Sequence, residues 1–425
     1  MANTPDDGVT EVAVDQTGKR SLFEPARLGK LTLRNRFIKA ATFEGVSPHG
    51  RVTDELIEFH REMAEGGVAM TTVAYMAVAS EGRTHRDCLM ARTEALGDLR
   101  ALADAVHGEG ALISTQLGHA GPVANASSNG AKSLAPGRMF NPLGLRFAKA
   151  ADAGDIARVI ADYERATGLC VQAGFDALEV HVGHNYLLSS FLSPKLNRRS
   201  DAYGGSIENR ARFTLEVMRA VRSAAGRDVA VTAKLNMVDG YRGGLNIEDS
   251  LQVAKWLQDE DLVDAIELTA GSSLMNPMFY FKGDPPVKEF VETLPWYLRG
   301  GFRMVGDKFL KTYPYEEAYF AEMARRFREA LDLPLSLMGG VSDLETAEAA
   351  IAEGFDFVAM GRALLHDPFL IDAYRTGKGS ESGCIHCNLC MTTIYTGTHC
   401  PISDPWPGDQ VPDRYHSSMT NRRSK

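Results

Sequence analysis

The amino-acid sequence predicts a (β/α)8 barrel, and two observations support this fold class. Short apolar segments alternate with segments of helical periodicity, so that each of eight expected strands is followed by an expected helix. No linker interrupts the alternation between residues 21 and 375 of the 425-residue chain, which indicates one large domain. A doubly wound open sheet is the alternative. It is less favoured because no Gly-x-Gly-x-x-Gly motif follows the first expected strand.

The expected strands are short, mainly apolar runs. In chain order they are Phe37–Ala41, Ala69–Ala74, Ala111–Leu117, Ala177–His181, Val229–Leu235, Ala265–Thr269, Leu335–Met338 and Phe357–Met360. The expected helices repeat apolar residues at helical spacing. They include Thr53–Ala64, Glu94–Gly108, Ile156–Ala173, Ile207–Ala225, Ile247–Asp259, Glu316–Ala330 and Leu344–Ala352. In such a barrel the active site lies at the carboxyl ends of the strands.

Three segments depart from the alternation. Residues 1–20 are polar and acidic, and we expect a flexible arm that is neither a signal peptide nor a transit peptide. Gly271–Pro314 is a long insertion rich in aromatic residues, and loops of that length inside a domain usually have a function. We expect it either to cover the active site or to form an interface between subunits of a homo-oligomer. Residues 376–425 form a tail with four cysteines, whose last dozen residues are expected to be disordered.

Charge and composition argue against several classes of function. The formal net charge is −9 and the sequence pI is near 5.7, which disfavours nucleic acid or an anionic membrane surface as the main partner. No run approaches the ~18 apolar residues of a membrane span, and the expected location is the cytoplasm. Four of the six cysteines cluster near the C-terminus. In a reducing compartment such clustering indicates metal or redox chemistry rather than a disulfide scaffold.

Residues 174–213 carry the strongest functional signal. An expected buried strand, Asp176–His181, ends in His181 and is followed closely by His184 and Tyr186. Two imidazole N–H groups can hold a carbonyl or phenolate oxygen, and a tyrosine hydroxyl beside them can donate a proton. Each of these residues alone would be interpreted as an ordinary loop or core residue. All three at one strand end indicate a catalytic site.

The run from His181 to Arg210 resembles the Old Yellow Enzyme family of FMN-dependent ene-reductases. That family has His-x-x-His (or His-x-x-Asn) then x-Tyr, followed by Phe-Leu-x-Pro and Tyr-Gly-Gly-Ser-x-Glu-Asn-Arg, and this chain matches each motif. The resemblance implies a flavin site in which His181 and His184 hold the substrate oxygen and Tyr186 donates the proton. Asn185 stands where the family usually has glycine, and asparagine tolerates the left-handed backbone of such a turn.

Residues at other strand ends match the family's FMN contacts. Gly340 ends the seventh strand and Gly361 with Arg362 ends the eighth, where glycine lets backbone N–H groups approach a phosphate and arginine adds a bidentate charge. Gln116, at the end of the third strand, offers the flavin pyrimidine edge both a donor and an acceptor. Lys234, at the end of the fifth, replaces the family's arginine near flavin N1, where a cation stabilises the reduced flavin. The alternative for Lys234 is a solvated strand-end lysine.

Two positions depart from the family pattern. The family contacts the flavin with Thr or Cys at the position of Phe43, so that either Thr42 takes over the contact or the contact is missing. Tyr75 stands where the family usually has alanine or glycine near the flavin O4, and it is expected to narrow the substrate space or to supply a second phenol. The family's substrate preference is therefore not carried over.

The cysteines near the C-terminus, Cys384, Cys387, Cys390 and Cys400, are candidate metal ligands. The spacing of the first three wraps a loop around one centre, and thiolates select iron–sulfur clusters or zinc. The loop resembles that of trimethylamine dehydrogenase and 2,4-dienoyl-CoA reductase, relatives that carry [4Fe-4S] just after the barrel, although the gap to the fourth cysteine is shorter here. We expect [4Fe-4S] ahead of zinc, with free thiols as the alternative.

The resemblance predicts an FMN-dependent oxidoreductase. NAD(P)H would reduce FMN, and the flavin would pass a hydride to the β-carbon of an alkene conjugated to a carbonyl or nitro group. One alternative is an amine or carbonyl dehydrogenase that passes electrons through the cysteine cluster to an external carrier. Another is a flavin-binding protein that has lost catalysis, which the departures at Phe43, Tyr75 and Lys234 suggest.

Overall fold

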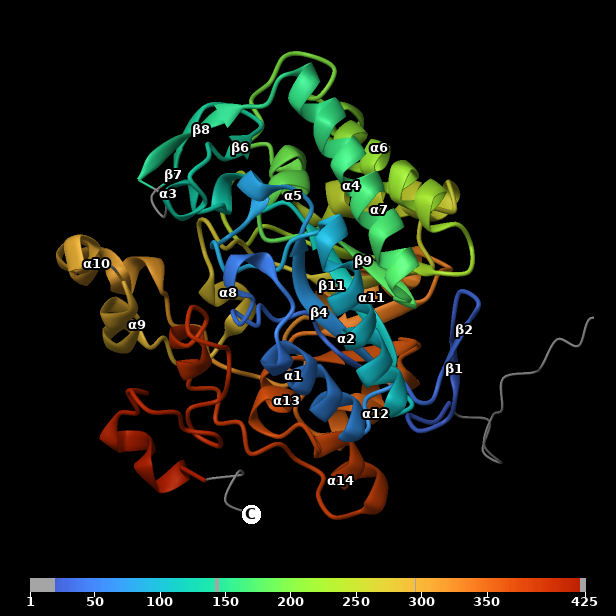
Figure 1. Cartoon of the computed structure of the whole chain (residues 1–425), viewed down its shortest axis with the longest axis vertical. Helices are drawn as coiled ribbons and strands as arrows, with labels where there is room; N and C mark the ends of the chain where they lie inside the picture. The colour runs from blue at the N-terminus through green and yellow to red at the C-terminus, as the bar shows by residue number, and fades with distance from the viewer. Residues whose placement is uncertain (1–19, 142–144, 295, 421–425) are drawn as a thin grey trace, which may run out of the picture.

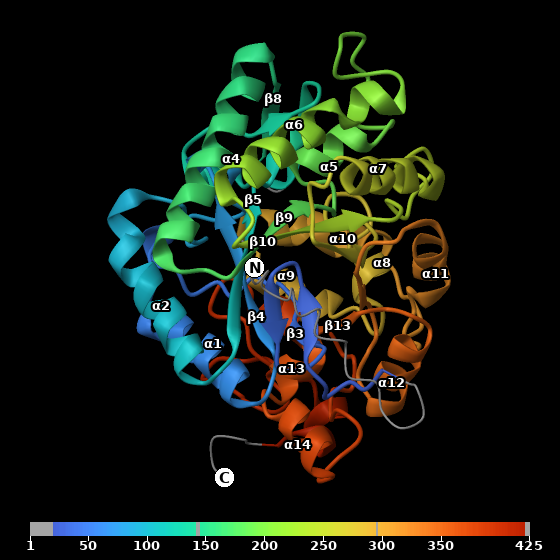
Figure 2. The ribbon, with the colours of Figure 1, turned by 90° about the vertical axis from the view of Figure 1, so that its right-hand side faces the viewer.

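Eight parallel strands close into a barrel, which confirms the predicted fold class (Figures 1 and 2). The computed structural model describes residues 20–141, 145–294 and 296–420. The barrel strands are β3 (Phe37–Lys39), β4 (Met70–Ala77), β5 (Leu112–Gly118), β9 (Ala177–Val182), β10 (Ala230–Asn236), β11 (Ala265–Thr269), β12 (Leu335–Met338) and β13 (Phe357–Met360). Each overlaps one of the eight expected strands, and β13 pairs with β3 to close the barrel.

Helices surround the barrel, as Figure 2 shows. They are α1 (Asp54–Glu65), α2 (Leu96–Gly108), α4 (Ala153–Ala173), α6 (Ile207–Ala225), α7 (Ile247–Asp259), α11 (Ala321–Ala330) and α12 (Leu344–Ala352), with α13 (Arg362–His366) and α14 (Leu370–Thr376) after the last strand. Their ends follow the local sequence. For example, Asp152 and Asp155 form a capping box at the start of α4, and Gly174 ends that helix in the left-handed region with φ of 88°.

One expected helix boundary is wrong. The helix expected from Glu316 begins only at Ala321. Tyr319 and Phe320 instead pack against the two glycines that end β12, and Phe320 is buried. Packing of these two rings against the glycines, with Phe320 fully buried, outweighs the helical periodicity of this segment.

The two ends of the barrel differ in chemistry. At the amino ends of the strands, the hairpin of β1 (Ala26–Leu28) and β2 (Leu31–Leu33) packs apolar side chains into the barrel. It meets the first inward-facing residues of the strands, including Ile38, Met70 and Phe357. Toward the carboxyl ends the inward-facing residues are polar and buried. This leaves the carboxyl end as the place for a site.

The sequence did not reveal a small three-stranded sheet between β5 and α4. Its strands are β6 (Leu134–Ala135), β7 (Met139–Asn141) and β8 (Arg146–Ala150), preceded by the short helix α3 (Ala126–Asn129). The strands are short, and four of the five residues of β8 are exposed. A strand of this kind lacks the apolar periodicity that predicts buried strands.

The insertion after β11 contains α8 (Met278–Phe281), α9 (Val287–Thr293) and α10 (Trp296–Phe309). Helices α9 and α10 project from one side of the barrel (Figure 1). Near α8 the insertion covers the barrel mouth, because the Tyr280 ring stacks on His184 with 4.4 Å between the ring centroids. This contact accords with the expectation that the segment covers the candidate site, and the alternative of a subunit interface stays a prediction.

The C-terminal tail is ordered over much of its length. It contains the 3-10 turns η5 (Leu389–Thr392) and η6 (Asp413–Ser418). The expectation of disorder over the last dozen residues is wrong for residues 414–420, because Tyr415 is buried beside Cys387 and donates a hydrogen bond to Asp284. Residues 421–425 and the expected arm, apart from Arg20, lie outside the described residues.

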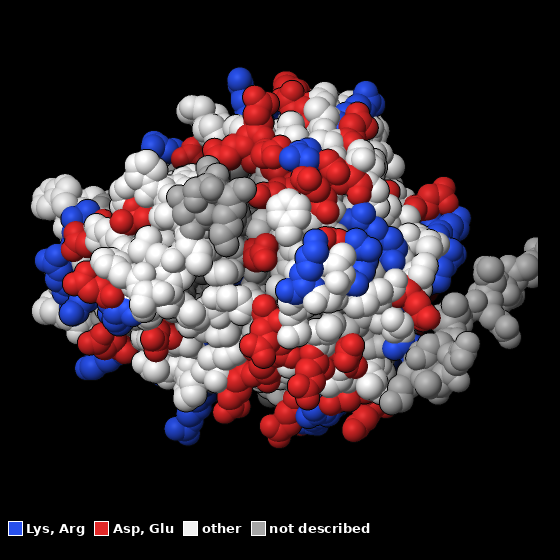
Figure 3. Space-filling model, turned by 90° about the horizontal axis from the view of Figure 1, so that it is seen from below, with Lys and Arg blue, Asp and Glu red and all other residues white. Residues whose placement is uncertain are grey.

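On the face seen from below in Figure 3, acidic side chains gather toward the top and toward the bottom of the view, and basic side chains lie between and beside them. This pattern accords with the net charge of −9. Within residues 20–141, 145–294 and 296–420, no helix combines the length and apolar character needed to cross a membrane.

Candidate active site

The three residues predicted to carry the chemistry converge at the end of β9. The His181 ring lies 5.1 Å from the His184 ring and 4.4 Å from the Tyr186 ring, measured between centroids. His184 and Asn185 both adopt left-handed backbone, with φ of 57° and 60°. The left-handed turn predicted at Asn185 is therefore present, and it returns the chain so that all three side chains meet.

Hydrogen bonds to the loop after β10 and to the end of β11 hold this turn in place. Asn185 Nδ2 donates to Asp239 Oδ1 at 3.0 Å, and the Tyr241 hydroxyl donates to Asn185 Oδ1 at 3.0 Å. His184 Nε2 lies 2.9 Å from Thr269 Oγ1 at the end of β11. The amide of Asn185 thus makes bonds that the family's glycine lacks, so the substitution anchors the turn as well as shaping it.

Burial sets the protonation of the three groups. It lowers the pKa of His181 well below the ordinary value and that of His184 to about 3, with smaller contributions from Lys234. Both imidazoles are therefore neutral at physiological pH. Burial and the nearby Tyr280 raise the pKa of Tyr186 well above its ordinary value, so that the phenol keeps its proton. His181 Nδ1 is buried and has no hydrogen-bond partner among the described residues, which leaves it for a ligand.

Tyr75 contributes its ring to the site rather than its hydroxyl. The hydroxyl donates to the Gly82 carbonyl at 2.7 Å and accepts from the Thr84 N–H at 2.8 Å. The ring lies 5.5 Å from the Tyr186 ring. A Cβ at Gly118 would lie 2.8 Å from the Tyr75 ring, so glycine is required there. The predicted narrowing of the substrate space fits this geometry better than the predicted second phenol.

Sequence reasoning missed two other aromatic residues at the site. Tyr280 comes from the insertion and stacks on His184. Tyr395 comes from the tail, lies 5.0 Å from the His85 ring, and contributes to the raised pKa of Tyr186. Both the insertion and the tail depart from the alternation of strands and helices in the sequence. Nothing local in the sequence indicated which of their aromatic side chains reach the site.

Lys234 is buried and paired with two glutamates rather than solvated. Its Nζ lies 2.6 Å from Glu267 Oε1 and 3.3 Å from Glu179 Oε1. Gln116 Nε2 donates to Glu179 Oε1 at 2.6 Å. Sequence reasoning also missed Glu179 and Glu267, although an acidic residue inside a short apolar strand was an available signal.

The glycines predicted to form a phosphate site end the paired strands β12 and β13. Gly340 has φ of 81°, and a Cβ there would lie 2.5 Å from Tyr319 Cδ1. A Cβ at Gly361 would lie 3.5 Å from Thr42 Cγ2. Thr42 therefore lies on the phosphate side of the expected flavin site, and its hydroxyl accepts a hydrogen bond from Lys39 Nζ at 2.6 Å.

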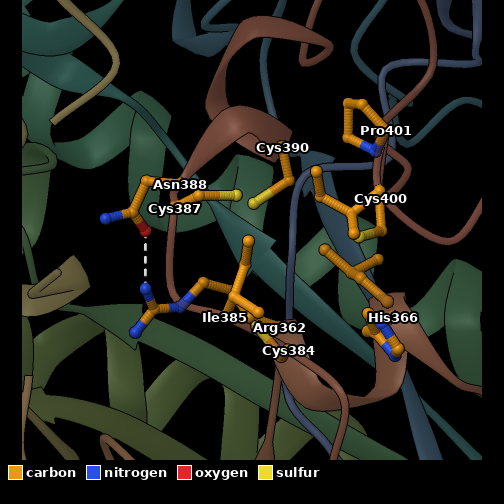
Figure 4. Close-up of a pocket in the computed structure, with 11 residues that line it drawn as sticks. Arg362, His366, Cys384, Ile385, Cys387, Asn388, Cys390, Cys400 and Pro401 are labelled. Atoms are coloured by element: carbon orange, nitrogen blue, oxygen red, sulfur yellow. Dashed lines mark hydrogen bonds between the residues drawn. The ribbon is translucent and has the colours of Figure 1, made fainter. Parts of the chain in front are cut away.

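Arg362 joins this glycine region to the cysteine loop (Figure 4). Its Nη1 donates to the Lys282 carbonyl at 2.9 Å and to Asn388 Oδ1 at 2.5 Å. Tyr315 lies under the guanidinium, 5.8 Å from the ring centroid. The residue predicted to bind phosphate thus connects the last strand, the insertion and the tail.

All four predicted cysteine ligands line one small cavity, together with Arg362 and Pro401 (Figure 4). Burial raises the pKa of Cys387 to about 11. Burial also raises the pKa of Cys390, and the nearby Arg362 opposes that increase only in part. In the described residues, no group of three or more His, Cys, Asp or Glu side chains converges closely enough to hold a single metal ion. The loop thus brings the four cysteines to one small cavity.

Comparisons with known proteins agree with this geometry. The model of the NADH:flavin oxidoreductase / NADH oxidase family matches residues 21–277. A 4,4'-dithiodibutanoate disulfide reductase of Rhodococcus erythropolis is 53% identical over 90% of this chain and 95% of its own length. A metal reductase of Desulforamulus reducens is 31% identical over 88% of this chain, which spans only 52% of that protein. The structure of an old yellow enzyme homologue from Zymomonas mobilis superposes with a TM-score of 0.70 at 23% identity, covering 92% of this chain and all of that one. The chain therefore belongs to the NADH:flavin oxidoreductase / NADH oxidase family.

Proposed function

We propose that the protein uses NAD(P)H to reduce bound FMN and passes a hydride to a small electrophile, an alkene conjugated to a carbonyl or nitro group. The observation that carries this proposal is the convergence of two neutral histidines and a protonated tyrosine at the end of β9. Neutral imidazoles can hold the oxygen of such an acceptor by hydrogen bonds, and the phenol of Tyr186 can protonate its α-carbon.

The residues at the barrel mouth fit FMN. Gly340 and Gly361 end neighbouring strands, where backbone N–H groups can approach a phosphate, and Thr42 lies beside Gly361. Gln116 carries an amide suited to the pyrimidine edge, and Lys234 is a buried cation that contacts the same Glu179 carboxylate. When bound, FMN supplies the hydride chemistry.

The side chains around the acceptor then act in named ways. His181 would donate a hydrogen bond from its ring to the acceptor's oxygen, because its Nδ1 has no protein partner among the described residues. Tyr186 would give its phenolic proton to the α-carbon, and a proton from solvent would restore the phenol. The rings of Tyr75 and Tyr280 would exclude water from this space.

An organic disulfide is a second candidate acceptor, and the 53% identity with a disulfide reductase favours it. The hydride would add to one sulfur and break the S–S bond, which releases one thiol and one thiolate. His181 and His184 would hold the developing thiolate, and Tyr186 would protonate it to the second thiol. The same three residues thus serve either acceptor.

The test follows the absorbance of the FMN-loaded protein under anaerobic conditions. We expect NADH or NADPH to bleach the flavin, and either 2-cyclohexenone or 4,4'-dithiodibutanoate to restore it. The faster acceptor identifies the substrate class. Bleaching by an amine but not by NAD(P)H would favour the dehydrogenase alternative. Bound flavin that responds to neither donor would favour a protein without catalysis.

We expect Arg362→Ala to weaken FMN binding. Loss of a charged hydrogen bond to the phosphate costs about 1.5–3 kcal/mol, which is roughly 10- to 150-fold in the dissociation constant. Fluorescence titration of the FMN-free protein with FMN measures this constant. Arg362→Lys is the matched variant. It keeps the positive charge but lacks the paired N–H donors of the guanidinium group, so it should lose less affinity for FMN than Arg362→Ala. If the wild type, Arg362→Ala and Arg362→Lys bind FMN with equal affinity, Arg362 does not contact the phosphate.

A [4Fe-4S] cluster in the cysteine loop would be a second cofactor. Four cysteines that line one cavity support a thiolate-bound cofactor, and the spacing of the first three is typical of a cluster loop. Arg362 contacts the same loop through Asn388, so that the cluster would lie beside the expected phosphate end of FMN.

A further inference from the structure

A buried array of charged side chains, Glu179, Lys234 and Glu267, lies inside the barrel beside the catalytic histidines. The three side chains come from the consecutive strands β9, β10 and β11, and each residue is at most 5% exposed. Lys234 Nζ lies 2.6 Å from Glu267 and 3.3 Å from Glu179. Lys234 is also the register partner of His181 on β9. The array therefore lies at the level of the substrate-binding histidines.

This array has one carboxylate more than its lysine can balance. Burial, and then the nearby Glu267, raise the pKa of Glu179 above that of an exposed glutamate. Burial alone would lower the pKa of Lys234, but Glu179 and Glu267 outweigh it and raise that pKa. The ammonium thus stays charged, and any proton that the array gains goes to a carboxylate.

Other strands present few further charges to this array. Lys39 on β3 is buried, and burial lowers its pKa to about 8, while Glu44, Glu179 and Glu267 act in the opposite direction. From β5 the neutral Gln116 donates to Glu179. The neutral Ser336 on β12 pairs in register with Glu267, and His181 and His184 are neutral. Three carboxylates, Glu44, Glu179 and Glu267, therefore face two lysines, and one carboxylate remains in excess.

We propose that Glu179 and Glu267 together take up one proton when the bound flavin is reduced, and release it when the flavin is reoxidised. This inference rests on the proposed function. A hydride brings two electrons and one proton to the flavin, which leaves one extra negative charge in a barrel where water cannot screen it. One solvent proton converts one carboxylate to a carboxylic acid. The net charge of the barrel is then unchanged, and the Lys234 ammonium is left to face the reduced flavin.

The experiment is a potentiometric titration of the FMN-loaded full chain at several pH values around neutrality. The pH dependence of the midpoint potential counts the protons taken up per electron pair. We expect about two protons in the wild-type protein and about one in Glu267→Gln, because the variant has no excess carboxylate. Asp162→Asn is the matched control. Asp162 is also a buried carboxylate, but it lies on α4, outside the barrel, where it pairs with Arg158 and Arg165, and its loss should leave the proton count at the wild-type value.

Redox-difference infrared spectra of the wild-type protein test the same inference without a variant. Reduction should produce a carboxylic-acid C=O band that shifts in D2O, and Glu267→Gln should lack it. The inference is overturned if FMN-loaded wild-type protein shows no such band, or if Glu267→Gln takes up as many protons as the wild type. In both cases the proposed function stands. A protein that binds no FMN would overturn the inference and the proposed function together.

Discussion

Tyr186→Phe is expected to leave the reduction of the flavin by NAD(P)H near the wild-type rate and to slow its reoxidation by 2-cyclohexenone. The loss of a general acid costs about 10²–10⁴-fold in rate. Only the proton donor is removed, because the ring that packs 4.4 Å from His181 is retained. Burial raises the pKa of the Tyr186 phenol, so that the wild-type donor is protonated throughout the neutral range. Anaerobic stopped-flow measurements of the two half-reactions separate the two effects.

Tyr75→Phe is the matched variant for this experiment. The Tyr75 hydroxyl is already engaged with Gly82 and Thr84, so its removal should slow reoxidation much less than Tyr186→Phe does. If Tyr186→Phe reoxidises at the wild-type rate and Tyr75→Phe does not, Tyr75 is the donor. If both retain the wild-type rate, the proton comes from solvent, and the role proposed for Tyr186 is wrong.

Cys387→Ser is expected to abolish iron binding while FMN is retained. Anaerobically purified wild-type protein should contain about four irons per chain and absorb broadly beneath the flavin bands. Cys387 is buried and lines the cavity shared by the four cysteines, so its loss removes a ligand. FMN should remain, because Gly340 and Gly361 belong to the barrel strands rather than to the tail. Iron and acid-labile sulfide analysis, together with FMN release, measure both cofactors.

Cys170→Ser is the matched control, since Cys170 is buried in α4 against Met76 and lies outside the cysteine cavity. It should keep the full iron content. If metal analysis finds one equivalent of zinc and the cysteine loop adds no visible absorption, the loop binds a single zinc ion rather than a cluster. Protein that holds neither metal, although it was made with sufficient iron and zinc, would leave free thiols. The dehydrogenase alternative would then lose its internal route for electrons.

Local patterns were sufficient to predict the barrel and the convergence of three residues of the candidate site. The strands are short apolar runs whose burial depends on their own composition, and all eight were predicted close to their observed positions. His181, His184 and Tyr186 lie within six residues of one another. A strand end and one left-handed turn at Asn185 were therefore enough to bring them together.

The partners that come from distant segments were decided only by the tertiary structure. Tyr280 and Tyr395 reach the barrel mouth from the insertion and the tail, and neither segment has a periodicity that would indicate which side chains point inward. The expected helix start at Glu316 failed for a related reason. Burial of Phe320 against the barrel outweighed local helical propensity.

The charged residues inside the barrel show most clearly which features the sequence predicts and which depend on the closed fold. The sequence by itself determined that Lys234 ends a strand at the barrel mouth, because strand position follows from local pattern. Its pairing with Glu179 and Glu267 depends on the register between β9, β10 and β11, which closure of the whole barrel imposes. A shift of one residue in any of these strands would turn its charged side chain outward, so the array exists only in the closed fold.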